Sequence, residues 1–304
     1  MPAPDDPNYT VQFRALSYTI CMALKSSAAS VDGRTLPDRI ADHFIARIFT
    51  GDLAPGSRLP ADRELAPQLG VDRTSLRMAM QQLGRMGLIK ALRGSGVTVL
   101  DYREHAGLDF LAAVFKNRDL SLGSSFLLEA LDDWIEVIPE VVGRALARAT
   151  HSDLRALDSI LSQQMALLDA KAGMPAVIVL EIVLQDTIVR ILGNTTLVLL
   201  FNSSRPVRSY MSQLFFEETN VRQHVKAHQK VLRSATQDGA SYDVASEYRA
   251  YLKKHMLPLR RRLQALPPSP SLRPSAQNGF RAPGNASKRR PRSRHPLRSS
   301  TAVR

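Results

Sequence analysis

The chain has 304 residues, enough for about two domains of ordinary size. Its hydrophobic content of 44% supports buried cores and excludes a wholly disordered chain. The net charge of +13 suggests a polyanionic partner, but nine of the Lys and Arg residues follow Leu266, where there is no Asp or Glu. The overall charge is therefore mainly a property of the C-terminal end and does not by itself establish DNA binding.

Cysteine content and hydropathy exclude two further classes of protein. Cys21 is the only cysteine, which rules out an intrachain disulfide framework and a zinc site built from cysteines. No apolar run reaches the roughly 18 residues of a membrane span, and the N-terminus lacks the basic region and apolar core of a secretory signal. We expect a soluble protein of the reducing cytoplasm, without a membrane partner.

The pattern of apolar and turn residues divides the chain into five parts. Residues 1–33 form an N-terminal extension, residues 34–100 a compact unit and residues 101–123 a linker. Residues 124–266 have helical periodicity and no alternating strand runs, so we predict an all-α helical bundle there. Residues 267–304 are rich in Pro, Ser, Arg and Gly and are predicted to be a disordered basic tail.

The compact unit begins with two predicted helices. The first runs from Pro37 to Thr50, with apolar residues at helical spacing. The second begins near Ala61 and ends at Gly70, where glycine permits a sharp turn into a third helix. Two short helices joined by a tight turn are typical of a helix-turn-helix.

The third helix carries arginine and hydroxyl side chains in its first turn: Arg73, Thr74, Ser75 and Arg77. A recognition helix presents this turn to the major groove, where Arg can bind guanine through two donors and hydroxyls can contact phosphate or base. Residues 89–99 then predict a β-hairpin with a glycine-rich tip. The unit is therefore predicted to be a winged helix-turn-helix. The alternative is a small helical subdomain whose arginines form a solvated face.

At these residues the chain resembles the GntR family of bacterial transcriptional regulators. The motifs that carry the resemblance lie within residues 36–99: Gly51–Pro60, Arg63–Ala66, Leu69–Val71, Arg73–Arg77, Gly87–Leu88 and Gly94–Gly96. The resemblance implies a set of operator contacts. They are Arg63, Thr74 and Ser75 to phosphate, Arg73 and Arg77 to bases or phosphate, and Arg93 and Gly94 from the wing.

Two residues depart from the pattern of the family. Asp72 stands where many relatives have Ser or Thr, and a carboxylate near phosphate repels it unless the carboxylate caps the helix. Pro67 falls inside the second helix, where it removes a hydrogen bond and could cost about 3 kcal/mol. We expect Asp72 or its neighbour to cap the third helix, and the second helix to be kinked or to end early.

A winged unit followed by an all-helical region is similar to the FadR-like branch of this family, whose effector domain is a helical bundle. In its metal-binding members, an Asp and a His one turn apart and two later His hold a divalent ion, which anchors a carboxylate effector. These positions correspond to Glu181, Gln185, His228 and His255. Since a Gln amide is a poor ligand of transition metals, His224 is an alternative to Gln185.

The resemblance therefore implies Glu181, His228 and His255 as ligands of a divalent metal, zinc or similar, with Gln185 or His224 as a fourth. Alternatively, these histidines are packing or surface residues of the bundle. The arginine often found on the first helix of this branch has no counterpart, and Trp134 lies near its place. Other members bind an acyl thioester without metal, so the effector class stays open between carboxylate and acyl thioester.

We therefore expect a GntR-type transcriptional regulator of the bacterial cytoplasm and nucleoid, acting as a repressor. A homodimer would bind a pseudo-palindromic DNA operator, and a small molecule in the helical domain would control it. One alternative is an effector-independent architectural protein that uses the basic run Ser287–Arg294; that run could equally be a tail without a role. The least favoured alternative is an enzyme with an accessory DNA-binding domain, because no convergent nucleophile and base are seen.

Overall fold

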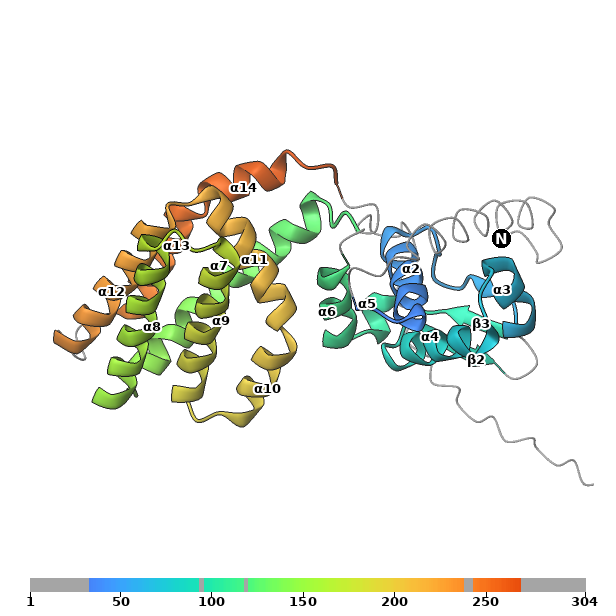
Figure 1. Cartoon of the computed structure of the whole chain (residues 1–304), viewed down its shortest axis with the longest axis horizontal. Coiled ribbons are helices and arrows are strands. Elements are labelled where there is room, and N and C mark those ends of the chain that lie inside the picture. Colours follow the sequence, from blue (N-terminus) through green and yellow to red (C-terminus); the bar gives the residue numbers. More distant parts are fainter. Residues whose placement is uncertain (1–32, 93–95, 118–119, 238–242, 269–304) are drawn as a thin grey trace, which may run out of the picture. The chain divides into compact units, whose positions relative to one another are not determined.

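The computed structural model describes residues 33–92, 96–117, 120–237 and 243–268. The fold is mainly α-helical, with a small antiparallel sheet that follows the first helices (Figure 1). This is the fold class that the sequence predicted. The basic run Ser287–Arg294 and nearly all of the N-terminal extension lie outside the described residues.

The N-terminal group of elements is a winged helix-turn-helix. Its three strands pair antiparallel in the order β1-β3-β2, with both Arg58 and Lys90 opposite Thr98. The sequence predicted the hairpin but not β1, which has only two residues. The elements are α2 (Leu36–Thr50), β1 (Arg58–Leu59), α3 (Asp62–Leu69), α4 (Arg73–Arg85), β2 (Ile89–Leu92) and β3 (Gly96–Val99).

Helix α2 forms because both of its ends are capped. Thr35 and Asp38 make a reciprocal capping box at the start, and Gly51 ends the helix at φ 84°. Phe44 and Ile48 lie on the stripe that packs against α4. The predicted helix Pro37–Thr50 is confirmed to within one residue.

Helix α3 continues through Pro67 to Leu69 and ends at Gly70, whose φ is 66°. The expectation that this helix ends before its predicted boundary is wrong. Proline removes the bond to the carbonyl of Arg63, four residues earlier, but the cap at Gly70, whose N–H bonds to the carbonyls of Ala66 and Pro67, closes the helix after Leu69.

The predicted linker 101–123 contains two helices, α5 (Tyr102–His105) and α6 (Leu108–Lys116). Helix α6 buries Phe110, Val114 and Phe115, which explains the short apolar patch in this part of the sequence.

The remaining elements form the helical bundle. Helix α7 packs against α9, α13 and α14, and α8 packs against α9 and α12. In the part of the chain that the structure describes, no helix is long and apolar enough to cross a membrane. The elements are α7 (Ser124–Leu146), α8 (His151–Asp169), α9 (Met174–Ile191), α10 (Thr195–Ser203), α11 (Arg205–Glu218), α12 (Val221–Gln237), α13 (Val244–His255) and α14 (Leu257–Gln264).

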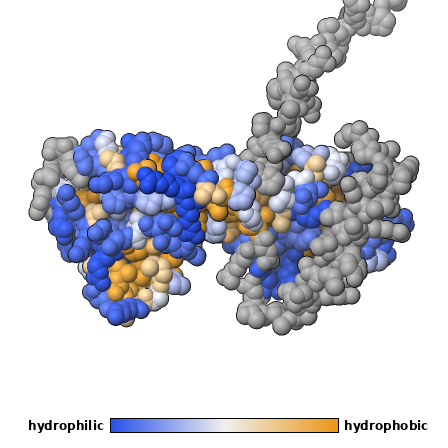
Figure 2. Space-filling model, turned by 90° about the horizontal axis from the view of Figure 1, so that it is seen from above, coloured by the Kyte–Doolittle hydropathy of each residue, from blue (hydrophilic) through white to orange (hydrophobic). Residues whose placement is uncertain are grey.

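In the view of Figure 2 most of the coloured surface is hydrophilic, and apolar side chains are exposed in several places. Large exposed apolar side chains occur on α9 and α10. On α9, Val179 is 61% exposed, and on α10, Leu199 is 60% exposed. None of the nine residues of α10 is buried, although Leu197–Phe201 are all apolar.

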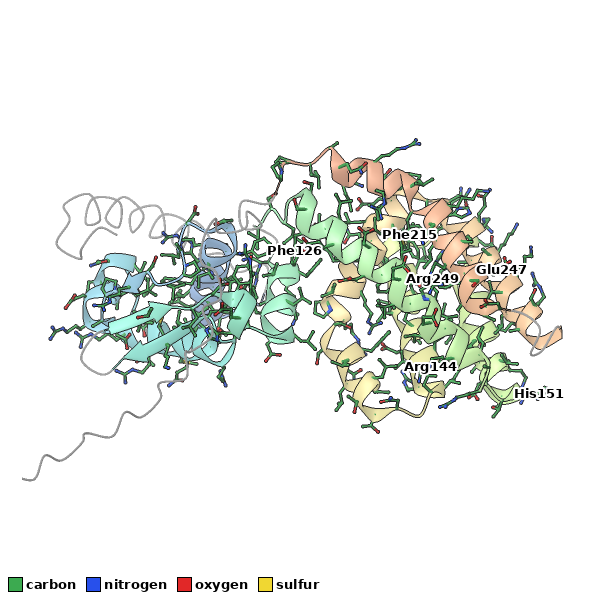
Figure 3. All side chains as sticks on the ribbon, turned by 180° about the vertical axis from the view of Figure 1, so that it is seen from behind. Phe126, Arg144, His151, Phe215, Glu247 and Arg249 are labelled. Carbon is green, nitrogen blue, oxygen red and sulfur yellow. The ribbon has the colours of Figure 1, made fainter. Side chains whose placement is uncertain are left out.

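Ion pairs join α13 to α7. The guanidinium of Arg249, which is labelled in Figure 3, lies 3.3 Å from Glu136 and 2.5 Å from Glu140, and Lys253 lies 3.1 Å from Glu136. Exposed pairs of this kind contribute little stability each. They link α13 to α7, and α13 carries Tyr248 into the interior of the bundle.

Candidate functional site

The recognition helix α4 starts at Asp72, which caps it. The carboxylate of Asp72 accepts a hydrogen bond of 2.8 Å from the backbone N–H of Ser75. This bond holds the pKa of Asp72 below its usual value. The prediction that Asp72 or its neighbour caps this helix is confirmed, and the carboxylate is committed to the helix start.

The first turn of α4 points its polar residues away from the core. Arg73, Thr74 and Arg77 are exposed and Ser75 is half-buried, whereas Leu76 is fully buried. This division follows from helical periodicity, and it places the predicted base-reading side chains on one accessible surface.

Two arginines near this surface lie close to carboxylates. The Nε atom of Arg77 lies 3.7 Å from Asp62 of α3, and Nε of Arg63 lies 3.2 Å from the neighbouring Glu64. Both arginines and Glu64 are exposed and Asp62 is half-buried, so a phosphate could replace the carboxylates at little cost. Arg93 and Gly94 lie outside the described residues, and contact of all seven residues with DNA stays a prediction.

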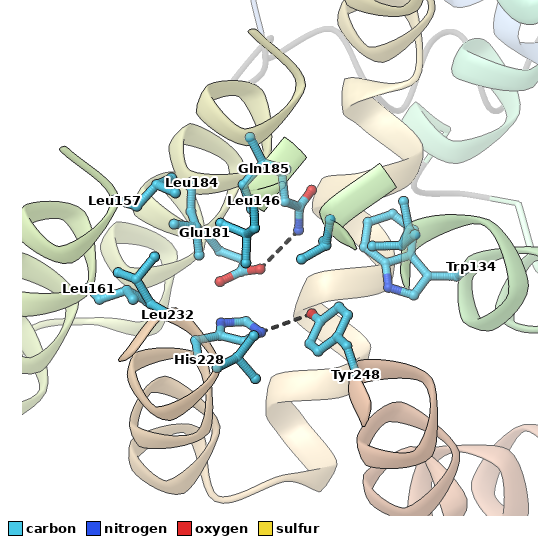
Figure 4. A pocket seen from close by; sticks show the side chains of 14 residues that line it. Trp134, Leu146, Leu157, Leu161, Glu181, Leu184, Gln185, His228, Leu232 and Tyr248 are labelled. Atoms are coloured by element: carbon cyan, nitrogen blue, oxygen red, sulfur yellow. Dashed lines mark hydrogen bonds between the residues drawn. The ribbon is translucent and has the colours of Figure 1, made fainter. Parts of the chain in front are cut away.

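The helical bundle contains a cavity of about 50 Å³ between α7, α8, α9, α12 and α13 (Figure 4). Four polar residues line it: Glu181, Gln185, His228 and Tyr248. The other lining residues are apolar: Trp134, Ile138, Val142, Leu146, Leu157, Leu161, Leu184, Ile188, Val231 and Leu232. A second cavity of about 20 Å³ shares Glu181, Gln185, Tyr248 and Trp134, and is also lined by His224. Trp134, which the sequence placed near this site, therefore lines both cavities.

Three side chains with metal-ligating atoms converge at these cavities. The ligand atoms of Glu181, His224 and His228 all lie within 4.8 Å of one another. The structure thus brings together two of the predicted ligands, Glu181 and His228, with His224, which the sequence offered as the alternative to Gln185. His255 lies outside this group, and its ring stacks on Tyr251 with 4.3 Å between centroids.

Hydrogen bonds hold each of the three ligands. The carboxylate of Glu181 accepts from Gln185 Nε2 at 3.0 Å and from Gln164 Nε2 at 3.2 Å. Nδ1 of His224 and Nε2 of His228 each lie 2.8 Å from a tyrosine hydroxyl on α13. Burial lowers the pKa of both histidines, so both are neutral near pH 7 and can act as ligands.

The donor set fits a divalent metal ion. The Nδ1 atom of His228 is buried and has no hydrogen-bond partner in the part of the chain that the structure describes. A metal on Nδ1 would satisfy this atom, with Nε2 donating its proton to Tyr248, which is the usual outer-shell arrangement of a histidine ligand. One carboxylate and two imidazoles are ligands that Zn²⁺ accepts.

The structure does not support Gln185 as the fourth ligand. Its Oε1 accepts a hydrogen bond of 2.9 Å from Arg208 Nη1, and its Nε2 donates to Glu181. The side-chain oxygen that could bind a metal therefore faces Arg208, and the amide nitrogen, which is not a metal ligand, faces Glu181. Sequence reasoning missed Arg208, which lies on α11, because nothing in the local pattern shows that this arginine is buried.

Comparison with known proteins assigns both regions. The family described as "Bacterial regulatory proteins, gntR family" matches residues 36–99, and the FCD domain matches residues 136–242. The HTH-type transcriptional regulator Mce2R of Mycobacterium tuberculosis is 34% identical over 137 residues, 42% of this chain and 56% of the relative. The uncharacterized HTH-type transcriptional regulator Rv0494 of the same species is 39% identical over 130 residues, 43% of this chain and 52% of the relative. The chain thus spans about half the length of these two relatives.

A third relative aligns over a longer part of the chain. The fatty acid metabolism regulator protein of Shewanella oneidensis is 27% identical over 216 residues, which is 71% of this chain and 87% of the relative.

Proposed function

The chain belongs to the GntR family of bacterial regulatory proteins and carries an FCD domain, and we propose that it is a DNA-binding transcriptional regulator rather than an enzyme. The observation that carries this proposal is the first turn of α4, where Arg73, Thr74 and Arg77 are exposed beside the cap Asp72. These are the side chains that a recognition helix presents to the major groove. The winged unit 34–100 is the proposed DNA-binding domain, and 124–266 the proposed effector domain.

The proposed assembly is a homodimer on a pseudo-palindromic operator. One small reading unit per chain contacts only a half-site, and two-fold symmetry supplies the second. The exposed apolar side chains of α9 and α10, Val179 and Leu199 among them, support burial of this surface against a second copy. Because its target is DNA, the protein would work on the nucleoid in the bacterial cytoplasm.

The proposed effector is a carboxylate with a hydrocarbon tail. Glu181, His224 and His228 would hold Zn²⁺ or a similar ion, which supplies a positive site for a carboxylate when it is bound. The apolar walls of the larger cavity favour a hydrocarbon tail over a hydroxylated one, because a buried hydroxyl without a partner is costly. The name of the Shewanella relative, a fatty acid metabolism regulator, supports a ligand of this kind.

The proposed outcome is repression that the effector relieves. Fluorescence anisotropy of a labelled operator, titrated with the full chain, tests it: short-chain carboxylates should release the operator, at a lower concentration for each carbon that the cavity of about 50 Å³ admits. Each added CH₂ that is buried is worth about 0.8 kcal/mol, or roughly a fourfold change in affinity. Release by acyl thioesters alone would assign the effector to that class instead. Binding that no small molecule changes, and that truncation at Pro267 abolishes, would favour an architectural protein.

A further inference from the structure

Arg208 reaches the candidate metal centre from α11 through a buried guanidinium. Its side chain is only 3% exposed. Nη1 donates to Gln185 Oε1 at 2.9 Å, and Nη2 donates to Asp186 Oδ1 at 2.7 Å and to the carbonyl of Phe201 at 2.9 Å. Asp186 balances the charge of the guanidinium, so Arg208 can stay ionised in the interior.

This contact determines which way the amide of Gln185 faces. A guanidinium can only donate hydrogen bonds, so the end of the amide that faces it must be the oxygen, which is an acceptor. With Oε1 turned toward Arg208, the amide nitrogen must turn the other way, where it donates to Glu181 Oε1 at 3.0 Å. Arg208 therefore sets the orientation of the Gln185 amide, and this orientation directs a hydrogen bond to Glu181.

Both oxygens of Glu181 are held by neutral amides. Oε1 accepts from Gln185, and Oε2 accepts from Gln164, whose side chain is fully buried. Neither amide brings a competing charge, so the full negative charge of the carboxylate stays available to a cation. Carboxylates that bind metals are commonly fixed in this way by hydrogen bonds in their outer shell.

We propose that Arg208 is a positioning residue of the metal centre: it locks Gln185 as a hydrogen-bond donor, and Gln185 in turn orients Glu181 toward the ion. The inference rests on the proposed function of the bundle. It predicts a centre with three protein ligands, Glu181, His224 and His228, from which Gln185 is excluded. Three protein ligands leave open the position that an effector carboxylate needs.

The test compares Zn²⁺ affinity of the full chain and its variants after chelator treatment, by competition with a chromophoric chelator. Arg208→Met and Gln185→Met should each weaken Zn²⁺ binding about 10–100-fold, as loss of an outer-shell partner does. The double variant should lose no more than Gln185→Met alone, since Arg208 acts through Gln185. Arg205→Met is the matched control, because Arg205 pairs with Asp186 at 2.6 Å, as Arg208 does, but within the described part of the chain it donates no hydrogen bond to Gln185. It should keep wild-type affinity.

A second readout separates positioning from a general loss of packing. With Co²⁺ in place of Zn²⁺, Arg208→Met should change the visible absorption spectrum in the wild-type background and leave it unchanged in the Gln185→Met background. Gln185→Met keeps the ion pair of Arg208 with Asp186, so it serves as the deciding variant if Arg208→Met does not fold.

The outcomes distinguish this inference from the proposed function. A wild-type chain that binds no Zn²⁺ would overturn the proposed metal centre and the inference with it. If the wild type binds Zn²⁺ but Gln185→Met binds it equally well, the inference alone fails. Additive losses in the double variant, or an equal loss in Arg205→Met, would also overturn it and leave the metal centre standing.

Discussion

The Nε2 atom of His228 on α12 lies 2.8 Å from the hydroxyl oxygen of Tyr248 on α13. One turn away, Nδ1 of His224 lies 2.8 Å from the hydroxyl of Tyr251. Burial raises the pKa of both tyrosines, so both phenols stay protonated. Two parallel His–Tyr contacts between α12 and α13 therefore orient both imidazoles of the proposed metal centre.

Replacing Tyr248 by Phe should weaken Zn²⁺ binding about 10–100-fold, because His228 loses the partner that orients its ring. The measurement is the same chelator competition on the full chain. Tyr210→Phe is the matched control, since Tyr210 packs on Phe115 and lines neither cavity. Equal Zn²⁺ affinity in Tyr248→Phe and wild type would show that this hydroxyl does not support a metal ligand.

The winged unit could be predicted closely because its signals are local. Gly70 and Asp72 mark a helix end and a helix start within three residues, and the structure confirms both. Strand β1 was missed because two residues carry no alternating pattern; Arg58 and Leu59 are extended only because they pair with β3.

The candidate site could be predicted only in part because it is assembled from distant segments. The resemblance to the FadR-like branch implied Glu181 and His228 and left His224 as an alternative, but only the arrangement of α12 and α13 shows that His224 joins the group and that His255 stacks on Tyr251. Arg208 had no signal at all, since its burial depends on the packing of α11 against α9.

Gly87 is required by the close approach of another segment. Its φ is +74°, and a Cβ there would overlap the carbonyl oxygen of His105. Gly87→Ala should therefore lower the free energy of unfolding by about 1–3 kcal/mol or more. Gly84→Ala is the matched control: Gly84 lies within α4 with open space around it, and should gain about 0.5–1 kcal/mol. Urea unfolding of both variants checks the difference, and similar stabilities would contradict it.

His43 makes the winged unit less stable in mild acid. Burial, and then the charge of Arg47, lower the pKa of His43 from 6.5 to about 4. Between these values the unfolded chain binds a proton that the folded chain does not, so stability falls as the pH falls below about 6.5. The slope from this residue is about 1.4 kcal/mol per pH unit.

His43→Leu should remove that part of the slope. Urea unfolding of wild type and variant at pH 7, 6 and 5 measures it as the difference between the two curves. If the unfolding free energies of wild type and His43→Leu differ by the same amount at pH 7, 6 and 5, then His43 is not held neutral in the folded protein.

Asp72 combines a structural benefit with an electrostatic cost. Its carboxylate caps α4, yet it lies beside the residues proposed to contact phosphate. Asp72→Ser keeps a capping oxygen and removes the charge, so it should bind any DNA a few-fold more tightly at low salt. Asp72→Ala removes the cap as well, and its melting temperature should fall below that of Asp72→Ser. Unchanged DNA affinity in Asp72→Ser would place the start of α4 away from the phosphate backbone.

The most direct test of DNA reading by α4 is selection of a binding sequence from random DNA with the full chain, followed by anisotropy titrations of wild type, Arg73→Ala and Arg77→Ala. We expect an inverted repeat bound at least about a thousandfold more tightly than random DNA. Each variant should lose about 1–3 kcal/mol on the selected site and much less on random DNA, because the lost contact reads bases. A selection that yields no common sequence, or variants that bind the selected site as tightly as wild type does, would show that α4 does not read bases.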